Sequence, residues 1–212
     1  MSRKIVIFGI DGCPEEVLRK WVIEENKLSN FRRIYEGGIF TTMLSTIPYV
    51  TIPAWVSLLT GKTPGQLGVF SFFRREEGSY NAMPIDMNWK KWHPLWDILS
   101  ENNLRSIFIN VPSTIPPETE FNGILVGGPI MNTEPKNIAY PKELNDRLLK
   151  ENYVVDFNFS LKDKPSENIK KIFDYTRKKI SLAKSLYEGE DWDLSLIHIS
   201  EPTRPLYISY AV

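Results

Sequence analysis

An apolar run at the start of the chain, from Lys4 to Ile10, stops abruptly at the pair Asp11-Gly12. The run is rich in β-branched and aromatic side chains and lacks polar alternation, which is typical of a strand buried on both faces at the centre of a parallel sheet. A carboxylate at the end of such a strand is a natural hard ligand for a divalent cation. The run therefore predicts both a sheet position and a candidate cation ligand, Asp11.

A second apolar segment, residues 51–60, predicts a helix with Thr51 as its N-cap, Pro53 in its first turn and Gly61 at its end. A hydroxyl at that position lies beside backbone N–H groups, where an anionic phosphoryl group is favoured. Alone, Thr51 is most often only a cap, and Asp11 could simply cap the following helix. Together the two residues predict a metal-assisted phosphoryl-transfer site in which both side chains reach one cation.

Helical and extended patterns alternate along the rest of the chain, which predicts an α/β fold with a mostly parallel sheet sandwiched by helices. The predicted helices begin at Pro14 and Ser29 and span 94–103, 141–151 and 166–188, and the predicted strands span 39–44, 106–111 and 123–127, with a further strand after 191–194. Residues 62–92 follow neither pattern, and we interpret them as an excursion from the sheet near the site.

Composition excludes several classes of function. The 212 residues suit one domain or part of a larger one, and 26 basic residues balance 26 acidic ones, so no global field favours nucleic acid or an anionic membrane. The single cysteine, Cys13, cannot form an intramolecular disulfide, and we interpret it as a buried or half-buried thiol. With no leader pattern and no apolar run of membrane-spanning length, we expect a soluble cytoplasmic protein without a nucleic-acid or membrane partner.

Five motifs occur in order along residues 4–194: Ile-Phe-Gly-Ile-Asp-Gly (7–12), Ser-Thr-Ile-Pro-Tyr-Val-Thr-Ile-Pro-Ala-Trp (45–55), Leu-Thr-Gly-Lys-Thr-Pro-Gly (59–65), Gly-Val-Phe-Ser-Phe-Phe (68–73) and Pro-Leu-Trp-Asp (94–97). This series resembles the alkaline phosphatase superfamily, and within it the type I phosphodiesterase/nucleotide pyrophosphatase branch. The resemblance implies a phosphoric-ester hydrolase with two divalent metal ions, usually zinc and sometimes manganese, and a small phosphorylated substrate. It implies that Asp11 is a metal ligand and that Thr51 is the nucleophile and also contacts the metal.

The chain departs from the family pattern in its later metal ligands. An Asp-x-x-x-His, an Asp-His-Gly turn and a final histidine are missing, and neither of the two histidines, His93 and His198, has the required spacing. Leu67 stands where the family commonly has a glycine-flanked histidine. We therefore expect a truncated and poorly active fragment of a hydrolase. The alternatives are a phosphomutase of the same superfamily and a non-catalytic protein that binds a phosphorylated ligand.

The end of the chain differs in character from the rest. After Leu194 the sequence resembles a translated sequencing-library adapter, from residue 195 or 196 to residue 212. We therefore predict that residues 1–195 are the N-terminal part of an alkaline-phosphatase-like α/β domain and that residues 196–212 are a non-native tail. On this interpretation His198 has no functional meaning.

Other residues near the predicted site could contribute to function, although a structural interpretation is simpler for most of them. A basic rim from Arg74-Arg75 and Lys90-Lys91 could attract phosphate, although a solvated charged loop is the simpler interpretation. The nearby aromatic residues could stack on a base, but most are expected to pack beneath the loop. Asn110, at a strand end, could face the site without an assignable role.

Overall fold

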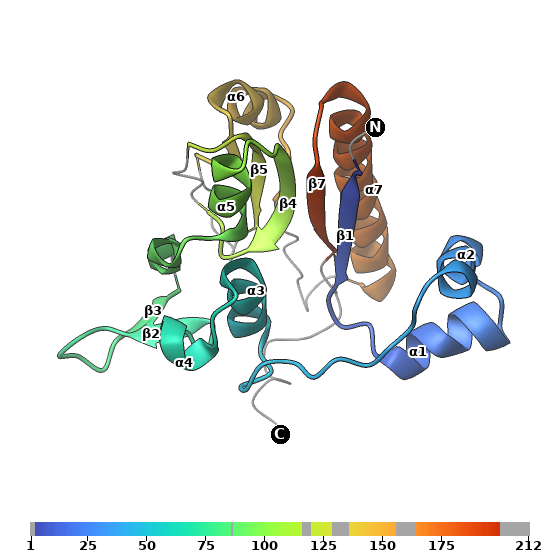
Figure 1. Cartoon of the computed structure of the whole chain (residues 1–212), viewed down its shortest axis with the longest axis horizontal. Coiled ribbons are helices and arrows are strands. Elements are labelled where there is room, and N and C mark those ends of the chain that lie inside the picture. Colours follow the sequence, from blue (N-terminus) through green and yellow to red (C-terminus); the bar gives the residue numbers. More distant parts are fainter. Residues whose placement is uncertain (1–2, 86, 116–119, 129–135, 156–163, 200–212) are drawn as a thin grey trace.

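A five-stranded sheet in the order β1-β7-β4-β5-β6 forms the centre of the computed structural model (Figure 1), which describes residues 3–85, 87–115, 120–128, 136–155 and 164–199. Four strands are parallel: β1 (Ile5–Ile10), β7 (Leu194–Ile199), β4 (Ser106–Pro112) and β5 (Gly123–Gly128). The short strand β6 (Ala139–Tyr140) pairs antiparallel with β5. The predicted α/β fold with a mostly parallel sheet is confirmed.

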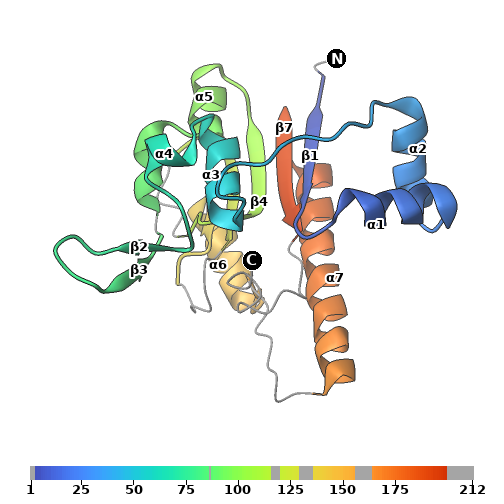
Figure 2. The ribbon, with the colours of Figure 1, turned by 90° about the horizontal axis from the view of Figure 1, so that it is seen from below.

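Helices cover both faces of the sheet (Figure 2). On one face, α3 (Thr51–Thr60) and α5 (Leu95–Glu101) pack on Phe108, Leu125 and Leu196 of the sheet. On the other, α6 (Lys142–Lys150) and α7 (Pro165–Gly189) pack on Ile107, Val126 and Ile197. Adjacent residues of one strand serve opposite cores because side chains alternate along it. Within the described ranges, no helix has both the length and the apolar character that a membrane span needs.

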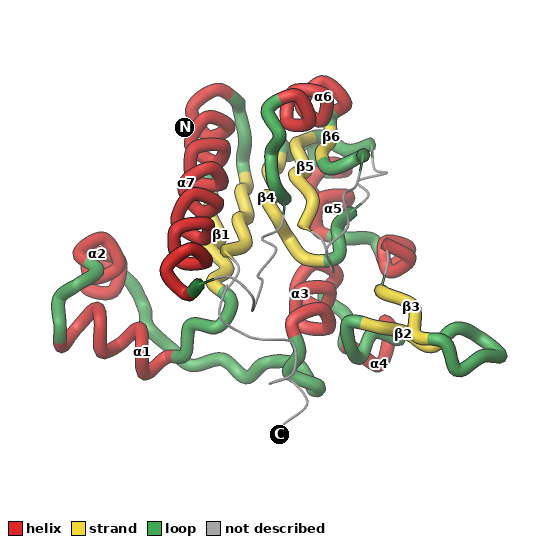
Figure 3. Tube along the Cα trace, turned by 180° about the vertical axis from the view of Figure 1, so that it is seen from behind, coloured by secondary structure: helices red, strands yellow, loops and turns green. Residues whose placement is uncertain are grey.

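Two groups of short elements extend from the sheet in opposite directions (Figure 3). The first follows β1 and consists of α1 (Glu15–Arg19), the π-helical turn η1 (Lys20–Glu24) and α2 (Ser29–Gly37), which together we call the N-terminal arm. The second lies within residues 62–92 and consists of α4 (Pro64–Leu67), the hairpin of β2 (Phe73–Arg75) with β3 (Ala82–Pro84), and the 3-10 helix η2 (Met87–Trp92).

Two sequence predictions about the first fifty residues are wrong. The strand β1 was expected at the sheet centre, yet it lies at an edge, with Ile5 and Phe8 55% and 56% exposed. The strand expected at residues 39–44 does not form, and Ile39 and Leu44 are almost fully exposed. In both cases the apolar pattern is typical of a buried strand, but β1 pairs with a described strand on one side only, and no described strand pairs with residues 39–44.

The segment that the sequence sets apart as a tail begins inside β7. Leu194, Leu196 and Ile197 are buried in this strand between β1 and β4. A buried strand was expected directly after Leu194, and residues 194–199 occupy that position. The rest of the predicted tail, residues 200–212, lies outside the described residues.

The contact between β1 and α3 gives a first prediction. A Cβ added at Gly9 would collide with the indole of Trp55. We expect Gly9→Ala to lower the free energy of unfolding by about 1–3 kcal/mol, because overpacking forces neighbours out of position. Gly37→Ala is the matched control, since a Cβ there meets nothing within 4 Å. Urea unfolding measures both; equal stability of the two variants would contradict the close packing of Trp55 on β1.

Candidate active site

The first strand and the turn after it position Asp11. The Asp11 N–H donates to the Ile199 carbonyl at 3.0 Å, which extends the pairing of β1 with β7 by one residue. Gly12 follows with a φ of 67°, a left-handed conformation that is unfavourable for residues with a Cβ atom. The chain therefore turns sharply toward α1, and the Asp11 carboxylate is left at the carboxyl edge of the sheet.

Helix α3 positions Thr51 at its first residue. Ile52 and Val56 are fully buried and hold the helix against the sheet. Gly61 ends α3, as predicted, in the left-handed conformation, and its N–H donates to the Ser57 carbonyl at 2.8 Å. The prediction that Thr51 is the N-cap is wrong: the cap residue is Val50, and no side chain caps this end.

Because it does not cap the helix, the Thr51 hydroxyl is directed to another partner. It donates to Asp11 Oδ2 at 3.4 Å, in a half-buried setting. The first helical turn offers the amides of Thr51 and Ile52 beside this hydroxyl, whereas Pro53 has no N–H and the Ala54 N–H donates to the Val50 carbonyl. The structure thus brings together the two residues that the sequence singled out, at the amino end of a helix.

The same corner holds a histidine that the sequence analysis set aside. His198 is buried on β7, its Nδ1 lies 2.8 Å from the Asn110 carbonyl oxygen, and its Nε2 lies 3.9 Å from Asp11 Oδ2. Nε2 has no hydrogen-bond partner among the described residues. The parallel register explains the approach, since His198 is aligned with Gly9 on the neighbouring strand. Only knowledge of that register could have placed His198 beside Asp11.

Asn110 supports the fold and does not present its side chain to the site. It lies at a register irregularity of β4 with a φ of 58°. Its amide nitrogen donates to the carbonyls of Gly127 and Val155, at 3.4 and 3.1 Å, and its Oδ1 accepts from the Tyr153 hydroxyl at 2.9 Å. Burial raises the pKa of the Tyr153 phenol, so this hydroxyl stays a donor across the physiological range. The side-chain polar atoms of Asn110 are thus occupied on the far side of β4.

Leu67 and His93, which the sequence analysis compared with the family pattern, also contact neighbouring residues of the fold. Leu67 is buried in the core beneath α3 and has no polar role. His93 lies half-exposed with Nε2 3.2 Å from Glu101 Oε2 and Nδ1 3.8 Å from Asp97 Oδ2, carboxylates that the sequence analysis did not connect to it. Burial raises the pKa of Asp97, opposed by the charges of Lys90 and His93.

Two residues of the 62–92 excursion, Arg75 and Trp89, make structural contacts within the protein. Arg75 stacks on the exposed Tyr80 ring at 4.2 Å and donates from Nε to the Ser79 carbonyl, so it closes the hairpin turn. Trp89 is buried and donates to Ser113, which agrees with the packing interpretation. Phe70 is exposed.

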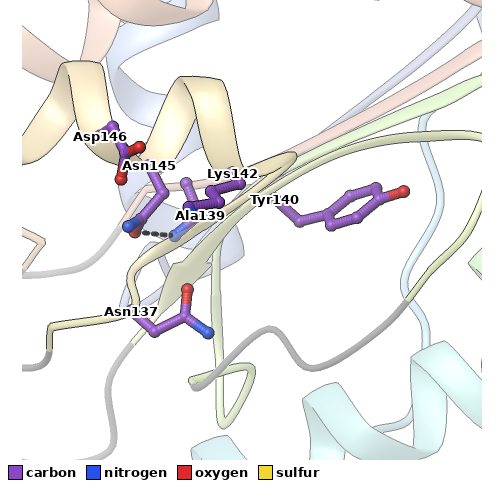
Figure 4. Close-up of a pocket in the computed structure, with 6 residues that line it drawn as sticks. All are labelled: Asn137, Ala139, Tyr140, Lys142, Asn145 and Asp146. Carbon is purple, nitrogen blue, oxygen red and sulfur yellow. Dashed lines mark hydrogen bonds between the residues drawn. The ribbon is translucent and has the colours of Figure 1, made fainter.

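Two of the surface pockets that the described residues form lie elsewhere. One of about 340 Å³ is at the opposite sheet edge, between β6 and α6, and Figure 4 shows Tyr140 extending away from Asn145 and Asp146. Asn145 is saturated there, because its Oδ1 accepts from the N–H groups of Ile138 and Ala139. The other, about 150 Å³ and apolar, lies between α1 and α2. Neither pocket is lined by Asp11 or Thr51.

Comparison with known proteins identifies the family. A model of the family described as type I phosphodiesterase / nucleotide pyrophosphatase matches residues 5–205. The chain belongs to this family. It is thereby a member of the alkaline phosphatase superfamily, as the motifs predicted. Searches of curated proteins and of solved structures gave no match.

Type I phosphodiesterases act on small phosphorylated substrates and are generally dependent on divalent metals. The side chains of this chain that could bind a metal ion can be compared with that requirement. Asp11 and Thr51 are two candidate oxygen ligands that lie in contact with each other. A catalytic zinc site needs three protein ligands and an open position. In the described part of the chain, no group of three His, Cys, Asp or Glu side chains is arranged to hold a metal ion. The described residues therefore do not fit a complete metal centre.

The role of Asn110 gives a second prediction. We expect Tyr153→Phe to lower the free energy of unfolding by about 1 kcal/mol through the lost hydrogen bond, and Asn110→Ala by about 2 kcal/mol or more. Asn110→Gly separates the two costs of the alanine change, because glycine accepts the positive φ but makes no side-chain hydrogen bond. Urea unfolding measures all three. An unchanged stability of Asn110→Ala would contradict the structural role.

Proposed function

We propose that this chain carries the nucleophile of a metal-dependent phosphoric-ester hydrolase, with Thr51 as the nucleophile and Asp11 as a metal ligand. The observation that carries the proposal is the 3.4 Å contact between the Thr51 hydroxyl and Asp11 Oδ2 at the start of α3. Family membership supports the reaction class, since the family hydrolyses phosphodiesters and pyrophosphates. The contact between these two side chains supports the assignment of roles within it.

The chemistry that these residues support is an in-line displacement at phosphorus. Thr51 Oγ1 attacks, an Oγ1–P bond forms, and the bond from phosphorus to the leaving oxygen breaks. The hydroxyl proton is directed at Asp11 Oδ2, its hydrogen-bond acceptor. The amides of Thr51 and Ile52 at the helix terminus are placed to hold nonbridging oxygens of the phosphoryl group. Water then attacks phosphorus in this intermediate, which still carries the second ester group of the substrate; the Oγ1–P bond breaks, a phosphate monoester is released and the Thr51 hydroxyl is restored.

The metal centre that we propose for the complete protein holds two divalent ions, with zinc favoured and manganese possible. A bound cation lowers the pKa of a coordinated hydroxyl and stabilises charge at the transferring group. The described residues fall short of a full ligand set for these ions. We propose that further ligands come from polypeptide that this chain lacks.

The shortage of metal ligands raises the question of whether the end of the chain is native. We propose that residues 196–212 are not native, on the strength of their likeness to translated adapter. Both β7 and the family match extend past residue 195, so sequencing of the genomic locus is the direct test. A reading frame that continues differently after Leu194 supports the proposal, and a natural gene that encodes Ser195 to Val212 overturns it. We call the product of the locus read in frame past Leu194 the native-frame protein.

The nucleophile is tested by conservative replacement in the native-frame protein. We expect Thr51→Ala to lower kcat/KM for bis(p-nitrophenyl) phosphate by about 10³-fold or more, because the step made only by the hydroxyl is lost. Thr51→Ser should retain most of the activity. Thr41→Ala, an exposed threonine in the preceding segment, is the matched control. Activity of Thr51→Ala near that of the control would exclude Thr51 as the nucleophile.

The 212-residue chain itself gives a further prediction. We expect no turnover of bis(p-nitrophenyl) phosphate above background when zinc or manganese is added, because ligand number and geometry set metal affinity. Metal-dependent turnover that disappears in Thr51→Ala would show that the residues present suffice.

Product analysis distinguishes the hydrolase from a phosphomutase. Transfer of phosphate to an added acceptor hydroxyl in place of water would identify a mutase. Binding of phosphate that survives Thr51→Ala without turnover would instead identify a binding protein.

We further propose a cytoplasmic location, consistent with the single half-buried thiol of Cys13.

A further inference from the structure

Helix α3 is anchored in the core that it shares with β4 and β5. Its buried residues Ile52 and Val56 belong to the same core as Phe108 of β4 and Leu125 of β5. In the sheet, β7 lies between these two strands and β1. This anchorage alone does not fix the distance between the first turn of α3 and the end of β1, where Asp11 lies. A contact between α3 and β1 is needed for that.

Trp55 makes this contact between α3 and β1. A Cβ placed on Gly9 would collide with Cη2 of the indole and would lie 2.7 Å from Cζ2 and 3.1 Å from Cζ3. The outer edge of the six-membered ring therefore fills the space that a side chain at position 9 would occupy. Trp55 also lies edge-on to His198, a residue of the predicted non-native tail. The contact with Gly9 does not depend on that tail.

A shift of Trp55 would be passed on to Thr51, because the two residues are one helical turn apart in α3. Residues i and i+4 lie one above the other on the same side of a helix. Helical side chains also lean toward the amino end, so the indole lies along the turn that begins with Thr51. If the indole were displaced from β1, the first turn of α3 would be displaced with it.

The contact between Thr51 and Asp11 leaves little room for such a displacement. The distance from Thr51 Oγ1 to Asp11 Oδ2 is 3.4 Å, already at the long end for a hydrogen bond. Asp11 is held on the sheet, because its N–H donates to the Ile199 carbonyl. A methyl group at position 9 would leave Cζ2 of Trp55 about 0.7 Å inside the 3.4 Å at which ordinary contact begins. A helix displaced by that amount would carry the hydroxyl out of reach of the carboxylate.

We propose that Trp55 is a positioning residue for the nucleophile: its contact with Gly9 sets the distance between the Thr51 hydroxyl and Asp11. The residues at positions 9 and 55 must then be matched in size, so that a methyl group at position 9 is tolerated only when the ring at position 55 is shortened. Trp55 acts only through the placement of α3. The consequence for catalysis rests on the proposed function, whereas the consequence for geometry does not.

Crystal structures of variants of the 212-residue chain test the geometry without turnover. We expect Gly9→Ala to lengthen the distance from Thr51 Oγ1 to Asp11 Oδ2 by about 0.5 Å or more. The double variant Gly9→Ala/Trp55→Phe should restore it, because a phenylalanine ring ends short of the colliding indole atoms. Gly37→Ala is the matched control, since its Cβ meets nothing within 4 Å. A distance in Gly9→Ala equal to that in the control would overturn the proposal, as would a double variant that stays displaced.

Kinetics of the native-frame protein test the consequence for catalysis. We expect folded Gly9→Ala to have a kcat for bis(p-nitrophenyl) phosphate about 100-fold lower than Gly37→Ala, with KM within about threefold, because misplacing a reacting group by about 1 Å costs this much. The double variant should recover about tenfold or more, since the two changes compensate. A purely structural role of Trp55 would lower the urea midpoint and leave both kcat and the Thr51–Asp11 distance unchanged, and that result would overturn the proposal.

The two measurements separate this proposal from the proposed function. A lengthened distance with an unchanged kcat would exclude the Thr51–Asp11 contact from catalysis, which overturns the proposed function and the catalytic role of Trp55 with it. If Gly9→Ala does not fold, Trp55→Phe decides, with Trp21→Phe as the control because Trp21 is 42% exposed. We then expect a kcat about tenfold lower for Trp55→Phe, since α3 is no longer held at β1. Equal kcat values for the two would overturn the proposal.

Discussion

The seating of α3 on the carboxyl half of β1 is the contact on which the candidate site depends. The indole of Trp55 lies against Gly9 of β1 and edge-on to the His198 ring, with ring centroids 4.8 Å apart. Because Gly9 has no side chain, the helix approaches the strand closely, and Thr51, one turn before Trp55, reaches Asp11 just beyond the strand. A bulkier residue at position 9 would separate the hydroxyl from the carboxylate.

Much of this arrangement could be predicted from local sequence. The bounds of α3, the buried strands β4 and β5 and the helices α6 and α7 follow from apolar periodicity and from Gly and Pro signals. The meeting of Asp11 with Thr51 could be proposed because strand ends and helix starts gather at the carboxyl edge of a parallel sheet. The approach of His198 could not, since it depends on strand order and register, which local patterns do not encode.

The two wrong strand predictions have a common physical origin. Periodicity reports which residues require burial, but whether they are buried depends on a neighbouring segment. The β1 run and residues 39–44 have the composition of buried strands and are exposed in the part of the chain that the structure describes. The mismatch between composition and exposure therefore marks apolar residues that the described part of the chain does not bury.

The central claim is that Asp11 and Thr51 act as one phosphoryl-transfer unit, and trapping the covalent intermediate tests it most directly. The native-frame protein would be quenched in acid during turnover, digested, and examined by mass spectrometry for phosphorylated residues. We predict a phosphoryl adduct on Thr51 that retains the second ester group of the substrate, and its loss in Asp11→Asn with the fold retained. Phosphate on any other residue, or labelling of Thr51 that is unchanged in Asp11→Asn, would contradict the claim.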